Sequence, residues 1–426
     1  MKRNECYDQY VEILREELMP ALGCTEPIAI AYAAAVARME LGEFPDRMEV
    51  ACSGNIIKNA KGVIVPQTEN MRGIRTAAIL GALGGDPRLK LEVLTRVTAE
   101  DVVEVRRYLE AGFAEEKLLD STETLHIIVT AARGTDEVLV ELKGFHTNIV
   151  RIVKNGVVVQ AESAAGKMIY PKRTDRSVLS LEGILDFAEN TDIGLVKDIL
   201  DRQIECNLAV AEEGLNHPYG ACIGATLLKY RGNTDPNVIP CAYAAAGSDA
   251  RMSGCVLPVV INSGSGNQGI TVSVPVIMFA REHACPEDKL YRALLISNLV
   301  AIYQKTMIGA LSAFCGAVSA ACGAGAAIMY LSGGSYKQIG QTIVNVLGNV
   351  AGIVCDGAKP SCAAKIAASL NAAFLAVDMA KEGNVFNDGE GIVKESTDDT
   401  MRAVGRMARR GMAETDREIL RIMINA

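Results

Sequence analysis

Two cysteines flank a short loop in the last third of the chain, Cys355-Asp356-Gly357-Ala358-Lys359-Pro360-Ser361-Cys362. Gly357 and Pro360 argue against a continuous helix there, and a loop can turn both sulfurs toward one point. Residues 363–370 are good helix formers, so the loop is expected at a helix N-terminus, which favours thiolate over thiol. Ionised sulfur at a fixed point suits zinc or an iron–sulfur cluster. Two buried structural cysteines are the alternative.

A third cysteine, Cys315, is followed by Gly316, which lets a bulky group approach the backbone. Cys322 would stand about 10.5 Å from it along one helix. At most one of them can therefore join the 355/362 pair, unless the helix breaks at Gly316 or Gly323. Cys322 lies among alanines and is interpreted as packing. Three cysteine ligands leave one position open, which indicates catalysis at zinc and a Lewis-acidic iron in a cubane cluster.

Cys24 is a further candidate, within Gly23-Cys24-Thr25-Glu26-Pro27. It lies beside Glu26 at a predicted helix start, where the pKa of a thiol can be depressed. A thiolate there can be a ligand or a base near the open position. A buried thiol at a helix start is the alternative.

Two loops rich in small polar residues can hold a carboxylate. Their candidate substrate-binding side chains are Ser53, Asn55 and Lys58 in the first loop and Ser263, Ser265 and Asn267 in the second. Read alone, such glycine-rich loops are more often simple turns. Arg251 is a lone cation in an apolar setting, and it is either paired with Asp249 or a carboxylate clamp. His217 can act as an acid or base, although a lone histidine is more often structural.

Composition excludes several classes of function. The chain has 426 residues, of which 49% are hydrophobic, and its net charge of −8 comes without a basic block, so we expect no nucleic-acid partner. Twelve cysteines in so long a chain do not form a small secreted disulfide framework. The charged start predicts no signal peptide and a cytoplasmic location. Uncharged stretches at 252–280 and 306–331 imitate membrane spans, but their polar loop and small residues favour buried helices.

The pattern predicts an α+β fold. A mainly helical body rich in Ala and Gly is expected from 1–87 and 171–426, with a small α/β module inserted at 88–170. The module is more charged than its surroundings. Its expected elements are strands at 91–96, 124–132, 137–143 and 148–160, with Asn155-Gly156 as a turn, and a helix at 99–111. In the body we expect helices at 4–18, 28–39, 73–84, 179–190, 193–213, 217–230 and 398–424, and a strand at 48–52.

Five motifs in order resemble the L-cysteine desulfidase family, which is related to the α chain of iron–sulfur L-serine dehydratases. They are Gly23 to Pro27, Ser53 to Asn59, Ala246 to Met252, Asn262 to Gly269 and Cys355 to Lys359. The resemblance spans nearly the whole chain. It implies a [4Fe-4S] enzyme that converts L-cysteine to pyruvate, ammonia and sulfide, with Cys315, Cys355 and Cys362 as cluster ligands. It implies that Cys24 is the base or a ligand, with the unique iron binding the substrate thiolate.

Two departures bear on the substrate. The dehydratases end in a cysteine that occupies the open iron, whereas the last cysteine here is Cys362, which favours the desulfidase branch. Residues 67–70 replace the glycines usual after Val65-Pro66, so specificity can have drifted. The alternatives are an L-serine dehydratase, a non-catalytic cysteine-rich sensor of an amino acid or metal, and a pyridoxal-phosphate lyase. The last would need a Schiff-base lysine, for which Lys58, Lys305 and Lys359 are candidates. We expect a small amino-acid substrate, no membrane partner and a homodimer.

Overall fold

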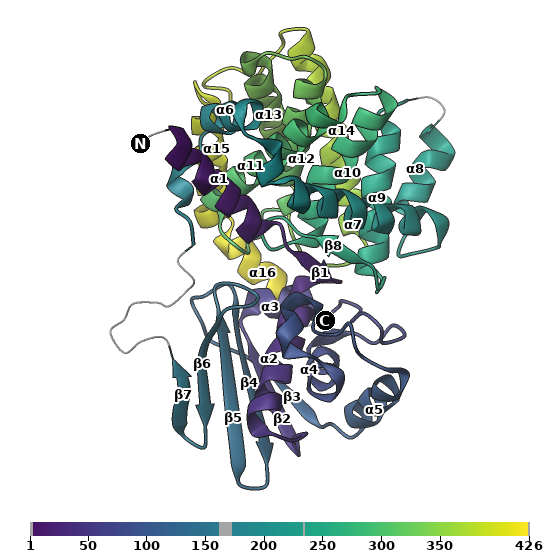
Figure 1. The fold of residues 1–426 in the computed structure, drawn as a ribbon, viewed down its shortest axis with the longest axis vertical. Coiled ribbons are helices and arrows are strands. Elements are labelled where there is room, and N and C mark those ends of the chain that lie inside the picture. The colour runs from purple at the N-terminus through teal and green to yellow at the C-terminus, as the bar shows by residue number, and fades with distance from the viewer. Residues whose placement is uncertain (1–2, 162–172, 233–234, 425–426) are drawn as a thin grey trace.

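The chain folds into a helical lobe and a smaller sheet lobe that meet along one side, as Figure 1 shows. The computed structural model describes residues 3–161, 173–232 and 235–424. The mainly helical α+β fold predicted from the sequence is confirmed. The first described helix lies on the helical lobe, and the last one lies at the junction of the two lobes (Figure 1).

The sheet lobe holds a six-stranded mixed sheet in the order β3-β2-β4-β5-β6-β7. Its strands are β2 (Arg47–Cys52), β3 (Ala114–Leu118), β4 (His126–Arg133), β5 (Asp136–Lys143), β6 (Ile149–Lys154) and β7 (Val157–Ala161). The β2–β3 pair is parallel and the other pairs are antiparallel. Helices α2 (Thr25–Leu41) and α4 (Gly73–Gly84) pack against the sheet, and α5 (Ala99–Glu110) packs against α4.

The predicted start of the inserted module at residue 88 needs correction. Strand β2 precedes residue 88, yet it pairs with β3 on one side and β4 on the other. Its alternate residues Met48, Val50 and Cys52 are buried, which is the period-2 pattern of a strand with one face in the core. The helices that cover the sheet also begin before residue 88. The predicted boundary at 170 lies outside the described residues.

The local predictions in the module mostly hold. Helix α5 begins with a capping box between Thr98 and Asp101, and β6 and β7 form a hairpin whose turn, Asn155-Gly156, has both residues at positive φ. The expected strand at 91–96 is wrong. A 3-10 helix, η1 (Pro87–Glu92), and a turn stand there because Asp86 caps the backbone N–H of Arg88 and Lys90 adopts a φ of 49°.

The helical lobe is built around α12 (Gly316–Leu331), which packs against α10, α11, α13 and α14. Close packing needs residues without side chains, since a Cβ on Gly323 would lie 2.2 Å from the carbonyl oxygen of Ser297. The other helices are α1 (Arg3–Glu17), α6 (Leu181–Asn190), α7 (Lys197–Asn216), α8 (Ile223–Arg231), α9 (Val238–Met252), α10 (Gly266–Glu282), α11 (Glu287–Ile308), α13 (Tyr336–Val350), α14 (Cys362–Lys381), α15 (Thr397–Arg406) and α16 (Ala413–Ile424).

Two features link the lobes. Strands β1 (Pro20–Leu22) and β8 (Pro258–Val260) pair antiparallel and join the start of α2 to the segment before α10. Helix α3 (Gly54–Ala60) follows β2 and packs against α16. The junction is therefore made of segments that are far apart in sequence.

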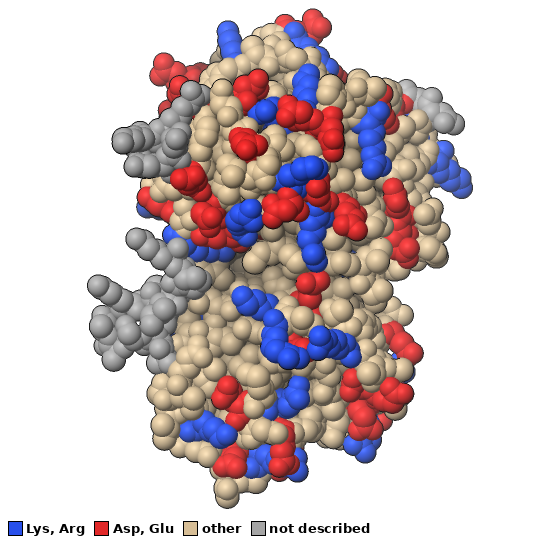
Figure 2. Space-filling model, in the orientation of Figure 1, with Lys and Arg blue, Asp and Glu red and all other residues tan. Residues whose placement is uncertain are grey.

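Neither uncharged stretch forms a single long helix. The chain leaves α11 at Ile308 and enters α12 only at Gly316, and residues 253–265 separate α9 from α10. Of the described helices, α14 is long and apolar enough to cross a membrane, but 56% of its most apolar window is buried inside the protein, as in a core helix. Acidic and basic side chains are interspersed over both lobes on the face shown in Figure 2.

Candidate active site

A cavity of about 430 Å³ lies at the junction of the two lobes, because segments of both lobes line it. The sheet lobe contributes the start of α2 and the loop between β5 and β6, and the helical lobe contributes three loops at helix starts. Eight of the predicted site residues line it: Cys24, Arg251, Ser263, Ser265, Asn267, Cys315, Cys355 and Cys362. Ser53, Asn55 and Lys58 do not, and Cys322 is packed inside α12.

Cys315 and Cys355 lie on paired backbone segments. The N–H of Cys355 donates to the carbonyl of Ala313 at 2.6 Å, and the N–H of Cys315 donates to that of Ile353 at 3.1 Å. Cys315 is the N-cap residue of α12, and the helix runs unbroken from Gly316 past Cys322, so only Cys315 of these two cysteines is directed to the loop, as the spacing argument allowed. Cys362 is the first residue of α14. All three cysteines are free thiols at the edge of the same cavity.

The loop between Cys355 and Cys362 is held from two sides. Gly357 has a φ of 97°, and a Cβ there would lie 2.2 Å from the backbone oxygen of Lys58. Asp356 forms ion pairs with Lys359 and Lys365. These contacts turn the loop toward the cavity and explain why glycine is required at position 357.

The expectation that the helix N-termini alone favour thiolates needs correction. Burial, followed by the neighbouring charge of Cys355, raises the pKa of the Cys315 thiol to about 12. Burial also raises the pKa of Cys362. The unfavourable free energy of removing a thiolate from water is larger here than the favourable free energy of its interaction with the helix N-terminus. These sulfurs ionise readily only when a cationic group is bound among them.

The three cysteines suit an iron–sulfur cluster better than one metal ion. Among the described residues, no group of three or more His, Cys, Asp or Glu side chains is close enough to hold a single ion. Cluster ligands bind different irons and are therefore spaced more widely. Cys315, Cys355 and Cys362 come from three segments, interact electrostatically and face one cavity. This donor set fits a cluster with three protein ligands.

Arg251 forms the cationic wall of the cavity. Its side chain is 3% exposed, and it makes no hydrogen bond or ion pair with any described residue. No hydrogen bond or ion pair joins it to Asp249, whose Oδ2 accepts from the backbone N–H of Gly224 at 3.2 Å and whose Oδ1 has no hydrogen-bond partner among the described residues. Gly266, the first residue of α10, leaves room for the guanidinium, since a Cβ there would lie 2.2 Å from Arg251 Nε. The carboxylate-clamp alternative is the one that this geometry favours.

The 263–268 loop places amide and hydroxyl groups beside Arg251. Ser265 caps α10 by accepting from the N–H of Gln268 at 3.5 Å. Ser263 donates to Asn262 Oδ1 at 2.8 Å. The side-chain oxygens of Asn267 and Gln268 are buried and have no hydrogen-bond partner among the described residues. A ligand with hydrogen-bond donors can satisfy them.

Ser53, Asn55 and Lys58 lie elsewhere, which contradicts their predicted place beside the 263–268 loop. They line a neighbouring cavity beneath the 308–313 segment and beside α16. Ser53 Oγ donates to the Thr124 carbonyl at 2.9 Å. Lys58 pairs with Asp416 of α16 and donates to the Cys355 carbonyl at 3.3 Å. Lys58 therefore supports the cysteine loop from the side of the neighbouring cavity.

Cys24 and Glu26 form a buried pair at the start of α2. The Cys24 thiol donates to Glu26 Oε2 at 3.0 Å, as does Thr25 Oγ1 at 3.1 Å. Burial, then the Glu26 charge, raises the pKa of Cys24 well above its ordinary value. The prediction of a depressed pKa for Cys24 is therefore wrong, because burial and the Glu26 charge outweigh the effect of the helix N-terminus.

Sequence reasoning missed His146, which lies in the loop between β5 and β6 and lines the cavity. Its Nε2 is 3.8 Å from Glu26 Oε1 and has no hydrogen bond with any described residue. Burial by itself raises the pKa of Glu26, but His146 and the Cys24 thiol outweigh burial and lower it to about 2. No motif surrounds His146 in the sequence, since only the sheet topology brings it to the site.

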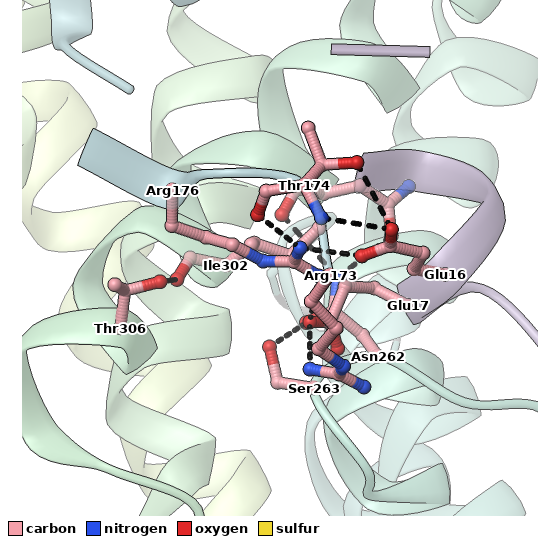
Figure 3. Close-up of polar contacts among 10 residues, drawn as sticks. Glu16, Glu17, Arg173, Thr174, Arg176, Asn262, Ser263, Ile302 and Thr306 are labelled. Carbon is pink, nitrogen blue, oxygen red and sulfur yellow. Dashed lines mark hydrogen bonds and ion pairs between the residues drawn. The ribbon is translucent and has the colours of Figure 1, made fainter. Parts of the chain in front are cut away.

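The rim of the cavity carries four charged residues, Glu16, Glu17, Arg173 and Arg176. Figure 3 shows both arginines pointing toward the two glutamates of α1. Arg173 and Arg176 each donate to Glu17 Oε1 at 2.9 Å, and Arg176 also pairs with Glu16. The guanidinium of Arg173 lies 3.7 Å from the centre of the Phe145 ring in the sheet lobe.

Comparison with known proteins defines the class. Residues 88–421 match the family model described as the serine dehydratase alpha chain, and the chain belongs to that family. Its curated relatives are named UPF0597 protein. The one from Lachnoclostridium phytofermentans is 55% identical over 98% of this chain and 100% of its own length. Those from Treponema denticola and Desulfitobacterium hafniense are each 48% identical, and each alignment covers 98% of the relative. Identity of 48% or more over nearly the full length of both chains places this chain in one family with these relatives.

Proposed function

We propose that this protein is a [4Fe-4S]-dependent carbon–sulfur lyase that converts L-cysteine and water to pyruvate, ammonia and sulfide. The observation that carries the proposal is one cavity lined by Cys315, Cys355 and Cys362 and by the unpaired Arg251. The three cysteines would hold the cluster, which when bound supplies an open iron as a Lewis acid for the substrate sulfur. Membership of the serine dehydratase alpha chain family supports this class of reaction.

Arg251 and the 263–268 loop would hold the amino acid. The guanidinium receives the α-carboxylate in a charge-assisted pair. The buried oxygens of Asn267 and Gln268, which lack partners among the described residues, accept from the α-ammonium. This leaves the β-carbon directed to the cysteine end of the cavity. Ser53, Asn55 and Lys58 have no part in this binding, because they line the neighbouring cavity.

Proton transfer would use His146. Elimination requires a base for the Cα proton, and imidazole is the usual general base. Cys24 keeps its proton in a hydrogen bond to Glu26, so we assign it as a positioning group for Glu26 and not as the thiolate base. Glu26 contacts both groups and holds them at the cavity wall. The 2-aminoacrylate formed with sulfide leaves and hydrolyses to pyruvate and ammonia.

Anaerobic reconstitution tests the proposal. The full-length protein, reconstituted with iron and sulfide, should turn brown and release sulfide and pyruvate from L-cysteine in equal amounts. Cys315→Ala and Cys362→Ala should lose iron and activity. Cys322→Ala is the matched control, because Cys322 is buried within α12 and does not line the cavity, and it should keep both. A fully reconstituted protein that releases no sulfide from L-cysteine would contradict the proposal.

An L-serine dehydratase is the second candidate, favoured by the family model. The same cavity would hold L-serine by the same carboxylate contacts, so comparing the two amino acids as substrates separates the candidates. For the pyridoxal-phosphate alternative, one of the three candidate Schiff-base lysines remains. Lys58 and Lys359 are ion-paired to Asp416 and Asp356, whereas Lys305 lines the cavity. Absorbance of the purified protein at the aldimine band tests it.

A further inference from the structure

We propose that Lys305 selects a thiol-bearing substrate over a hydroxyl-bearing one, by binding the substrate sulfur as an anion. This inference rests on the proposed function, because it concerns the side chain of the amino acid bound in that cavity. The carboxylate contacts of the site are the same for cysteine and serine, so discrimination between the two substrates would depend on Lys305.

Lys305 is a buried cation that faces the cavity. It lies in the last turn of α11, its residue is 7% exposed, and it lines the cavity with the four cysteines. Its ammonium group makes no hydrogen bond or ion pair with any described residue. Lys58 shows the contrast, because its residue is 2% exposed and its ammonium pairs with Asp416 and donates to the Cys355 carbonyl. A buried ammonium that faces a cavity without such partners is expected to receive them from a ligand.

The cavity thus holds two unpaired cations, Arg251 and Lys305, at different places. Arg251 lies against the start of α10 and interacts with Cys24. Lys305 lies in the last turn of α11 and lines the cavity together with Cys315 and Cys355, with which it interacts electrostatically more strongly than with Glu26. One amino acid has one carboxylate, and Arg251 accounts for it. The second cation therefore faces the side chain of the substrate.

Sulfur and oxygen differ strongly in how they respond to a nearby ammonium. A thiol has an ordinary pKa of about 8.5, so an opposite charge at short range suffices to ionise it near neutral pH. An aliphatic hydroxyl does not ionise in this range. The ammonium would therefore form an ion pair with a substrate thiolate and with the hydrosulfide that leaves it, and would offer a hydroxyl a hydrogen bond to an uncharged acceptor, which is weaker.

An unpaired buried charge also lowers stability, which gives the proposal a second readout. Removing water from an ammonium without providing a partner is unfavourable, so Lys305→Met should raise the melting temperature of the ligand-free protein. A lysine kept for structural reasons would show the opposite change. A residue that is kept for binding often lowers the stability of the folded protein, so its replacement raises stability.

Binding of two non-reacting ligands tests the selection without turnover. We would titrate the reduced, full-length protein by calorimetry at a pH of about 8.5 with 3-mercaptopropionate and 3-hydroxypropionate, before and after reconstitution. Lys305→Met should weaken binding of the thiol about tenfold or more and leave that of the hydroxyl ligand nearly unchanged. Lys305→Arg should keep the preference for sulfur. Arg251→Met, the matched control, should weaken both ligands together.

Two results would overturn the proposal. One is equal weakening of both ligands in Lys305→Met, which would make Lys305 a second carboxylate contact. The other is an unchanged preference for the thiol together with a lower melting temperature, which would make it structural. These experiments measure ligand binding and melting temperature, so they can be interpreted even if the reconstituted protein does not turn over L-cysteine. Failure of the proposed function and failure of the role of Lys305 are therefore distinguishable.

Discussion

At the scale of single residues, burial decides which groups carry protons in this site. Cys24 and Cys315 both lie at helix starts, and a helix start alone predicts a lowered thiol pKa. Burial raises the pKa of both thiols instead. Cys24 therefore enters the site with its proton, held by Glu26 at 3.0 Å. Imidazole is the usual general base, so the substrate proton is assigned to His146.

The first prediction concerns His146. His146→Asn removes the base but keeps a similar polar volume, so the kcat for L-cysteine should fall about 10²- to 10⁴-fold, with a small change in KM. Steady-state sulfide release measures both. His217→Asn is the matched control, because the His217 side chain is 59% exposed and contacts Glu213 outside the cavity, and it should have no effect. Loss of activity in Cys24→Ala with full activity in His146→Asn would reverse the assignment.

Asp249 provides a prediction on pH. Burial raises the pKa of its carboxyl to about 6, despite hydrogen bonds from the backbone at 221–224. The folded state then binds more protons than the unfolded state between a pH of about 4 and about 6, so this group makes stability fall as pH rises through that range. A shift of about two pKa units corresponds to about 3 kcal/mol. Asp249→Asn should remove that fall, measured as the free energy of unfolding against pH.

At the scale of elements, α16 supports the cysteine loop through α3. Lys58 of α3 pairs with Asp416 of α16 and donates to the Cys355 carbonyl at 3.3 Å. A Cβ on Gly54 would lie 2.3 Å from Leu420 Cδ2, so the two helices touch closely. The C-terminal helix and Cys355 are thereby joined by a single buried lysine. Residues that resemble a substrate loop in sequence serve here as a structural support.

Breaking that link should destabilise the protein. Asp416→Asn leaves the Lys58 ammonium buried without its charge partner, which costs about 3 to 5 kcal/mol, and the reconstituted protein should lose iron faster. Chemical denaturation and iron content measure the two effects. The double variant Lys58→Met/Asp416→Leu should recover most of the stability but not the iron retention, because the bond to Cys355 stays absent. Equal stability of Asp416→Asn and wild type would contradict this role.

At the scale of the whole molecule, the site exists only where the lobes meet. The sheet lobe provides His146, Cys24 and Glu26. The helical lobe provides Arg251, Lys305 and three further cysteines, Cys315, Cys355 and Cys362. Thr25 Oγ1 donates to the Gly264 carbonyl across the junction at 2.9 Å. Arg173 also spans it, since it contacts Glu17 on α1 and the Phe145 ring beside His146. The relative position of the lobes therefore controls whether base and substrate meet.

The prediction at this scale is that Arg173 holds His146 in place. Arg173→Leu keeps the apolar stem but removes the ion pair and the cation–π contact, which together are worth about 1 to 3 kcal/mol. The kcat should fall about tenfold, while binding of 3-hydroxypropionate stays unchanged, because Arg251 is untouched. Arg88→Leu, at an exposed ion pair with Asp86, is the control. Loss of ligand binding in Arg173→Leu would show that Arg173 contacts substrate.

Local patterns in the chain were sufficient for most elements and for the cysteines. Apolar periodicity predicted the helices and the β6–β7 hairpin, and Gly357 and Pro360 predicted the loop between Cys355 and Cys362. The spacing of Cys315 and Cys322 predicted that at most one of them joins Cys355 and Cys362, and only Cys315 lines the cavity. These predictions hold because capping, turn conformation and helix propensity depend on residues that are neighbours in sequence.

Only the tertiary structure decided which polar groups share a cavity. Ser53 and Asn55 resemble a carboxylate loop, yet β2 and α3 carry them to a neighbouring cavity. His146 has no motif, yet the β5–β6 loop brings it to Glu26. The pKa of Cys24 and the missing partners of Arg251 and Lys305 also depend on what surrounds them in space. Desolvation and pairing are set by contacts between segments distant in sequence, so no local pattern records them.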